Sequence, residues 1–212
     1  MKTKSHQKYK LLDGTIVPSV TTVLQNLGWN KNQLISWARR EAQAGNDPDK
    51  VRDKAADIGT LAHYLIECSL KNELADVTDY APSHLELATK AFEAYKQWSQ
   101  DRKIELVDSE LQLVSEQFKF GGTIDLLCKY DGQLSLIDFK TSKDVYADHK
   151  IQVSAYKKLL EENGHKIERV FILKISKEDG SYAHHEIPET TLEKGWETFN
   201  LLLNLHNLKK SF

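Results

Sequence analysis

Two apolar runs separated by one Asp-Gly pair constrain the fold of this chain more than any other feature. The runs span residues 123–130 and 133–140, and Asp131-Gly132 lies between them. Asp-Gly is typical of a two-residue hairpin turn, because both positions tolerate a positive φ. The pattern therefore predicts two antiparallel strands in which Tyr130 pairs with Gln133.

This register brings charged side chains together. Continuing the pairing places Asp125 opposite Asp138, and cross-strand partners have Cβ atoms about 4.5–5.5 Å apart. Side chains alternate between the two faces of a strand, so Lys140 and Thr123 are expected beside the carboxylates. Buried like charges repel unless one is protonated or a cation lies between them. Oxygen ligands suit Mg²⁺ or Mn²⁺, and a structural ion pair between Asp125 and Lys140 is the alternative.

The other side chains of the hairpin are mostly apolar on both faces, as in strands covered by helices on each side. The carboxylate face is expected to carry Leu127, Leu134 and Leu136. The opposite face is expected to carry Ile124, Leu126, Cys128, Ile137 and Phe139.

Hydrophobic periodicity assigns the remainder of the chain to helices and further strands. Helices are expected near residues 19–28, 31–44, 47–70 and 148–162, with two more that open near Ser83 and Thr190. In the helix at 31–44, Leu34, Trp37 and Ala38 are expected to be buried. Strands are expected at 105–115, 169–175 and 182–187.

This order of elements predicts an α/β fold with a central mixed β-sheet flanked by helices. A length of 212 residues favours one domain. We expect an N-terminal hairpin and helices at 1–57, an αβββαβ core at 58–187 and a C-terminal helix at 188–212.

Composition narrows the possible functions. The sequence has no run of about 18 apolar residues and no apolar core near its N-terminus, so we expect no membrane span and a cytoplasmic location. Its two cysteines cannot form a four-cysteine zinc or iron-sulfur centre. The formal net charge is −2. Residues 1–40 nevertheless carry seven Lys or Arg and one Asp, so this region is basic enough to attract a polyanion or is simply a solvated flank.

Several residues outside the hairpin are further candidates for a site. His63 and Glu67 share a helix face at i, i+4, where they join the site or form a surface pair. Gly59, one turn earlier, permits close approach of another segment. Gln152 and Tyr156 form a second i, i+4 polar pair after the hairpin. The remaining candidate is Glu110, an acid of the first sheet strand for which period two alone favours a solvent-facing position.

The order of these residues resembles the PD-(D/E)XK nuclease superfamily, and most closely its RecB-like exonuclease branch, which includes phage-type and mitochondrial genome maintenance exonucleases. The resemblance spans about half of the chain. It rests on Gly59-Thr60-x-x-His63-x-x-x-Glu67, Glu110, Gly122-x-x-Asp125, Asp138-x-Lys140-Thr141 and Gln152-x-x-x-Tyr156. Gly122 stands where the superfamily has its proline, which is usual in this branch.

The resemblance implies a restriction-endonuclease-like core with an N-terminal helical extension. It implies that the metal ligands are His63, Asp125, Asp138 and the backbone carbonyl of Phe139, with Glu67 and Glu110 as accessory acids. Lys140 would be catalytic together with the two aspartates. The substrate-binding residues would be Gly59, Thr60, Thr141, Gln152 and Tyr156.

The expected activity is Mg²⁺- or Mn²⁺-dependent hydrolysis of DNA, as an exonuclease acting on single strands or ends in replication, recombination or repair, as phage-type relatives do. The resemblance implies no iron-sulfur cluster, because the four cysteines of cluster-bearing members are absent. An endonuclease of the same fold and a catalytically silent nucleic-acid-binding module are the alternatives. If the chain is an exonuclease, the candidates to stack bases are Tyr9, Trp29 and Trp37.

Overall fold

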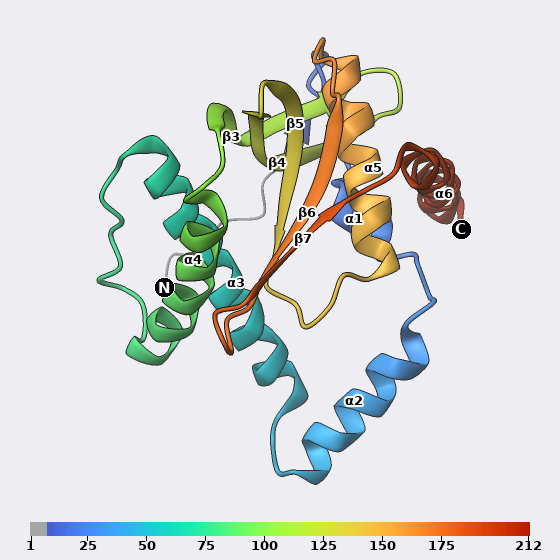
Figure 1. Cartoon of the computed structure of the whole chain (residues 1–212). Coiled ribbons are helices and arrows are strands. Elements are labelled where there is room, and N and C mark those ends of the chain that lie inside the picture. The colour runs from blue at the N-terminus through green and yellow to red at the C-terminus, as the bar shows by residue number, and fades with distance from the viewer. Residues whose placement is uncertain (1–7) are drawn as a thin grey trace.

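The computed structural model describes residues 8–212 and contains a five-stranded mixed sheet between two layers of helices (Figure 1). The strand order is β3-β4-β5-β6-β7, with β5 and β6 parallel and the other neighbours antiparallel. The strands are β3 (Ile104–Ser115), β4 (Phe120–Tyr130), β5 (Gln133–Lys140), β6 (Arg169–Ile175) and β7 (Tyr182–Glu186). A small separate hairpin pairs β1 (Tyr9–Lys10) with β2 (Ile16–Val17). The predicted α/β class with a mixed sheet is confirmed.

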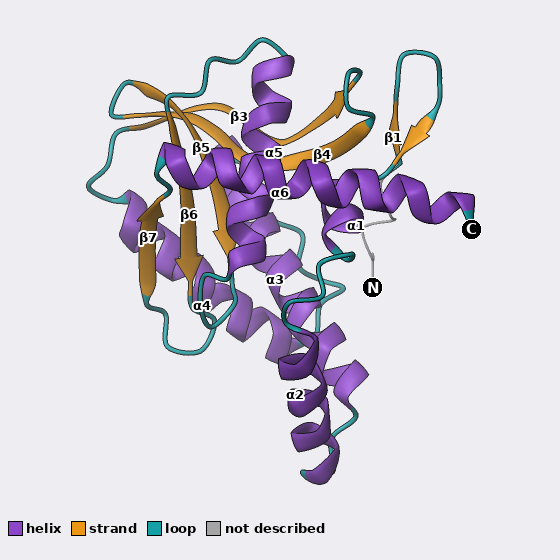
Figure 2. Ribbon diagram, turned by 90° about the vertical axis from the view of Figure 1, so that its right-hand side faces the viewer, coloured by secondary structure: helices purple, strands orange, loops and turns teal. Residues whose placement is uncertain are grey.

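Six helices occur in the described part of the chain. They are α1 (Val20–Leu24), α2 (Lys31–Gln43), α3 (Pro48–Lys71), α4 (Pro82–Ser99), α5 (Ala147–Glu162) and α6 (Glu189–Leu208). A short 3-10 helix, η1 (Lys209–Ser211), follows α6. In Figures 1 and 2, α3 and α4 cover one face of the sheet, whereas α1, α5 and α6 cover the other. None of the helices in residues 8–212 combines the length and the apolar character that crossing a membrane requires.

Helix α3 shows how the sequence fixes one border of the site. The carboxylate of Asp47 accepts hydrogen bonds from the backbone N–H groups of Asp49 and Lys50, and Pro48 occupies the first turn, where no intrahelical N–H bond is lost. The helix ends at Asn72, which adopts a left-handed conformation with φ 55°. These signals define a 24-residue helix long enough to carry His63 along the sheet.

Two apolar clusters hold the layers together. One packs α1, α5 and α6 against the sheet through residues such as Phe120, Leu127 and Phe199, all fully buried. The other packs α3 and α4 through residues such as Leu61 and Trp98, which are also fully buried. Burial of this kind stabilises the fold by about 25 cal/mol per Å² of apolar surface removed from water.

The central hairpin has the predicted register. Tyr130 pairs with Gln133, and the ladder continues in that register to Leu126 opposite Ile137. Asp131 and Gly132 have φ values of 51° and 82°, as a tight primed turn requires. Asp125 and Asp138 follow directly beyond the last pair of this ladder.

Two local predictions are wrong. Ile124 packs in the same cluster as Leu127, not with Leu126, because β4 changes phase at Asp125. Helix α2 has no buried residue: Leu34 is 59% exposed, and Trp37 and Ala38 are only half-buried, since no sheet face lies against this helix. The helices expected to open near Ser83 and Thr190 begin at Pro82 and Glu189, and neither has a side-chain hydrogen bond at its N-cap.

Candidate active site

Asp125 lies where β4 separates from β5. Its Oδ2 accepts a hydrogen bond of 2.8 Å from the backbone N–H of Phe139, so a side-chain carboxylate takes the place of the next backbone partner in the ladder. On its other side, Asp125 falls between the two β3–β4 pairs Ser109–Leu126 and Leu111–Ile124, opposite Glu110. Glu110 has a φ of 53°, which is rare for a residue other than glycine. The sheet is therefore irregular on both sides of Asp125.

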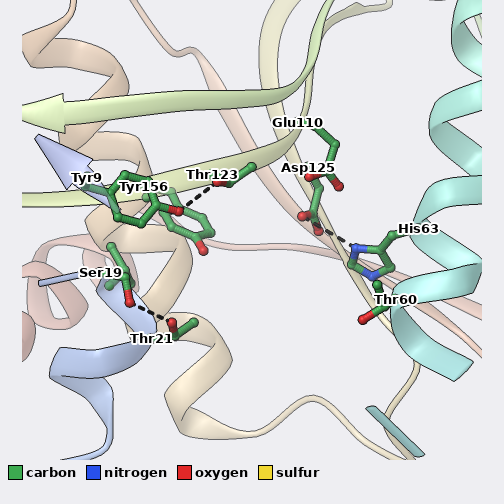
Figure 3. Close-up of a pocket in the computed structure, with 11 residues that line it drawn as sticks. Tyr9, Ser19, Thr21, Thr60, His63, Glu110, Thr123, Asp125 and Tyr156 are labelled. Atoms are coloured by element: carbon green, nitrogen blue, oxygen red, sulfur yellow. Dashed lines mark hydrogen bonds and ion pairs between the residues drawn. The ribbon is translucent and has the colours of Figure 1, made fainter. Parts of the chain in front are cut away.

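His63 and Glu110 meet Asp125 at this irregularity. His63 projects from α3, and its Nδ1 lies 3.6 Å from Asp125 Oδ1 (Figure 3). Figure 3 also shows the Glu110 side chain beside Asp125. One donor atom from each of His63, Glu110 and Asp125 lies within 4.8 Å of the others. The expectation that Glu110 faces solvent is thus wrong: it is half-buried in this group.

Asp138 and Lys140 form an adjacent ion pair. Lys140 Nζ lies 2.5 Å from Asp138 Oδ2, with 15% of the lysine side chain and 1% of the aspartate side chain exposed. Among residues 8–212, the group of potential metal-ligand atoms that lie close to one another comes from His63, Glu110 and Asp125 and does not include Asp138. Lys140 therefore lies beside Asp138, as their shared strand face predicts.

Burial and neighbouring charges shift the pKa values of the two aspartates in opposite directions. Burial raises the pKa of Asp138 to about 6, and the nearby Asp125 adds to this although Lys140 opposes it. Burial also acts to raise the pKa of Asp125, but His63, Lys140 and the Phe139 N–H together bring it below its usual value. For His63, burial acts to lower the pKa, and the charge of Asp125 outweighs it, so the net pKa is raised. Near neutral pH, Asp125 is an ionised carboxylate.

The donor chemistry of this group fits a hard divalent cation. An imidazole and two carboxylates within 4.8 Å offer one nitrogen and several oxygens, the ligand types that Mn²⁺ accepts and, for the oxygens, that Mg²⁺ prefers. Asp138 Oδ2 is a further buried oxygen nearby, and Lys140 Nζ is its ion-pair partner. A cation would relieve the repulsion between these buried acids.

Gln152 and Tyr156 lie on α5, which packs against the same part of the sheet. Gln152 Nε2 donates a hydrogen bond of 2.8 Å to the Tyr156 hydroxyl, which orients a ring that is 5% exposed. A Cβ atom at Gly122 would lie 2.7 Å from Tyr156 Cε1. The absence of a side chain at Gly122 therefore allows Tyr156 to reach the site. Burial, followed by the charges of Asp138 and Asp125, raises the pKa of Tyr156 well above its usual value, so its hydroxyl stays protonated.

Gly59 and Thr141 form a close contact between α3 and the segment after β5. A Cβ atom at Gly59 would lie 3.0 Å from Thr141 Oγ1. The close approach at Gly59 is made to a side chain. Glu67, in contrast, lies outside the donor group, because its Oε1 is 2.7 Å from Lys71 Nζ one turn further along α3.

A cavity of about 230 Å³ opens beside these residues. Figure 3 shows Thr60, His63, Glu110 and Asp125 on one side of it, and Tyr156 with the N-terminal segment on the other. Five further residues line the cavity but are not part of the nuclease motifs: Tyr9, Ser19, Val20, Thr21 and Thr123. The hydroxyl groups of Tyr9, Ser19, Thr21 and Thr123 make one wall of the cavity polar.

The N-terminal segment is held in place along β4. The Tyr9 hydroxyl and Thr123 Oγ1 are 2.7 Å apart, and the backbone N–H of Gly121 donates to Pro18 O at 3.0 Å. Tyr9 packs so closely on Gly121 that a side chain at position 121 would have no room. The glycine at this position is the one signal in the sequence that points to the contact. Residues 1–7 of the basic N-terminal region lie outside the described residues.

Comparison with solved structures gives distant similarities. A putative exonuclease from Eubacterium rectale is 12% identical with a TM-score of 0.47, covering 71% of this chain and 68% of its own. The exonuclease LHK-Exo from Laribacter hongkongensis, solved in complex with dAMP, is 15% identical with a TM-score of 0.37, covering 74% of this chain and 90% of its own. No curated protein shows significant sequence similarity to this chain.

The sequence profile of one family matches most of the chain. The profile is that of the PD-(D/E)XK nuclease superfamily, and the match covers residues 35–201. It includes every candidate residue from Gly59 to Tyr156, together with the whole five-stranded sheet. This chain belongs to the PD-(D/E)XK nuclease superfamily.

Proposed function

We propose that this chain is a Mg²⁺- or Mn²⁺-dependent DNA exonuclease of the RecB-like branch that acts on single strands or DNA ends. The observation that carries the proposal is the arrangement of Asp125, Asp138 and Lys140 at the point where β4 and β5 separate, next to His63. A structural ion pair alone would not account for the additional donors that His63 and Glu110 supply.

In this proposal, His63, Asp125 and Glu110 hold the cation, Asp138 and the Phe139 carbonyl join them, and Glu67 plays no direct part. When bound, the cation stabilises the negative charge that develops on the phosphate and acidifies a water molecule. Phosphodiester hydrolysis needs both effects, because the scissile phosphate is already an anion when hydroxide attacks it.

The remaining residues position the substrate and the attacking water. Lys140 Nζ carries three N–H donors on a flexible stem, which suits it to orient the water or to neutralise charge on the phosphate. The protonated Tyr156 hydroxyl, oriented by Gln152, is a donor for a phosphate oxygen. Thr60 lines the cavity and Thr141 follows Lys140, so both place a hydroxyl where the DNA backbone would run.

The test is an assay of end-labelled linear single-stranded DNA with Mg²⁺ or Mn²⁺. We expect Lys140→Ala to reduce the rate about a hundredfold or more, because it removes a donor that acts on developing charge. Lys129→Ala is the matched control, since Lys129 lies on the same hairpin but its side chain is 54% exposed at the far end. Equal rates for Lys140→Ala and the wild type, or no cleavage by the wild type, would defeat the proposal. Cleavage of a closed circular single strand would replace the exonuclease by an endonuclease.

A further inference from the structure

A second cavity lies next to the candidate site and is larger, at about 860 Å³. It is bordered by α2, by the first turns of α3, by the segment that links β5 to α5, and by the turn between β6 and β7. Figure 1 shows α2 in blue, standing away from the sheet below the linking segment after β5. Thr141 and Ser142 line this groove, so it begins directly after Lys140.

Basic side chains outnumber acidic ones along the groove, and they come from three separate elements. The bases are Arg52, Lys143, Lys174 and Lys177, and the acids are Glu41, Glu178 and Asp179. Acids and bases of the groove both have local partners. Arg52 pairs with Asp49 and Asp53, and Lys174 and Lys177 donate to backbone oxygens. Asp179 accepts hydrogen bonds from the N–H and hydroxyl of Ser181, and Glu41 accepts one of 2.8 Å from the Asn46 amide. Lys143 Nζ lies 4.0 Å from Glu178 Oε1, a long contact between side chains that are 83% and 67% exposed, so a phosphate can replace Glu178 as its partner.

The groove also contains aromatic rings. Tyr146 is 43% exposed, and Trp37 on α2 is half-buried. Leu34, 59% exposed, continues the apolar strip on the same helix. Aromatic rings between cationic side chains bind unpaired bases, because each base has a face that can stack, whereas in a duplex these faces are covered by neighbouring base pairs.

We propose that this groove binds a single strand of nucleic acid on one side of the bond to be cleaved, with Trp37 and Tyr146 stacking on bases and Lys143 contacting a phosphate. The inference rests on the proposed nuclease function and adds the place where the strand is bound and the residues that bind it. Two observations carry it: the groove is lined by Thr141, the residue that follows Lys140, and cationic and aromatic side chains are combined in one cavity.

The experiment compares a short and a long substrate. Hydrolysis of a four-nucleotide and a twenty-nucleotide oligothymidylate is measured with Mn²⁺. We expect Trp37→Ala, which removes a stacking ring, and Lys143→Glu, which removes a phosphate contact, each to raise KM for the long strand about tenfold and to leave KM for the short strand and both kcat values unchanged. Trp29→Ala is the matched control, because Trp29 is 64% exposed and does not line the groove.

Binding without catalysis separates this inference from the proposed function. In EDTA, fluorescence anisotropy of a labelled twenty-nucleotide strand should give a weaker affinity for Trp37→Ala than for Trp29→Ala, and an unlabelled duplex should compete poorly. Tryptophan quenching by the strand should disappear in Trp37→Phe but persist in Trp29→Phe. A wild type that binds in this way but cleaves nothing would refute the nuclease proposal and support the proposal that the groove binds a single strand. Equal affinities for the two alanine variants, or preference for the duplex, would overturn the proposal that the groove binds a single strand.

Discussion

The candidate site and helix α2 are built in opposite ways. Asp125 and Asp138 project from strands whose apolar side chains are buried on both faces, and His63 projects from a helix packed along that sheet. Helix α2 buries none of its residues and leaves Leu34 and Ile35 59% and 46% exposed. The groove that borders α2 nevertheless begins at Thr141, beside the site.

This difference separates two requirements of a nuclease. Donor atoms that share a cation need positions fixed to within fractions of an ångström, and burial on both sides supplies this rigidity. A surface that accepts strands of any base sequence needs adaptable contacts, and an element with few buried contacts moves at little free-energy cost. The comparison predicts that substitutions in the two regions affect stability very differently.

The largest expected effect compares two leucines. Leu61 on α3 is fully buried, so Leu61→Ala should lower the free energy of unfolding by about 2–5 kcal/mol through lost apolar contacts and a cavity. Leu34→Ala on α2 should change it by less than about 0.5 kcal/mol, because most of that side chain is already in water. Urea denaturation followed by circular dichroism measures both. Similar losses for the two variants would break the comparison by showing that α2 is part of the core.

The second effect concerns a glycine at the site. Gly122→Ala places a methyl group 2.7 Å from Tyr156 Cε1, an overlap that should cost about 1–3 kcal/mol and displace the tyrosine. Gly28→Ala, near the start of α2, is the matched control, because a Cβ atom there meets nothing within 4 Å. Thermal unfolding should separate the two variants by several degrees, and the nuclease rate should fall for Gly122→Ala alone. If Gly122→Ala has the stability and activity of the wild type, the contact with Tyr156 does not constrain the site.

The smallest effect is a pH dependence of the free energy of unfolding, caused by a histidine in the packed layer. His184 on β7 stacks on Phe171 at 4.5 Å, and burial, followed by the charges of Arg102 and Arg169, lowers its pKa to about 4. The unfolded chain binds a proton at this residue near its usual pKa of about 6.5, whereas the folded chain does not. The unfolded state therefore binds more protons between pH 6.5 and 4, and stability is complete above 6.5 and declines as the pH falls.

His184→Phe should remove part of this decline in unfolding experiments between pH 4 and 7. The control His185→Phe changes an exposed histidine on the same strand and leaves His184 in place, so the decline should remain. An unchanged decline in His184→Phe would assign it to other groups.

The sequence predicted those parts of the fold whose cause is local. The Asp131-Gly132 turn set the hairpin register, because both residues adopt positive φ, and that register correctly placed Asp125 and Asp138 close together on neighbouring strands, although the ladder ends one pair before them. The order of the motifs also predicted the superfamily that the profile match confirms.

The remaining features depend on contacts between distant segments. The position of Glu110 follows from a backbone irregularity opposite Asp125, which no side-chain periodicity reports. The exposure of α2 was missed because an amphipathic pattern shows which face is apolar but not whether a partner covers it. The wall made by Tyr9 and Ser19 arises from a segment more than a hundred residues away from β4 in the sequence.

The carboxylate that closes the gap between β4 and β5 has a practical consequence. Asp125 uses Oδ2 to accept from Phe139 N–H and directs Oδ1 towards His63. An asparagine of the same shape retains the acceptor for Phe139 and presents an uncharged amide to His63. Asp125→Asn should therefore keep the strands in place while losing the negative charge, which makes it the variant of choice for trapping an uncleaved strand in crystals.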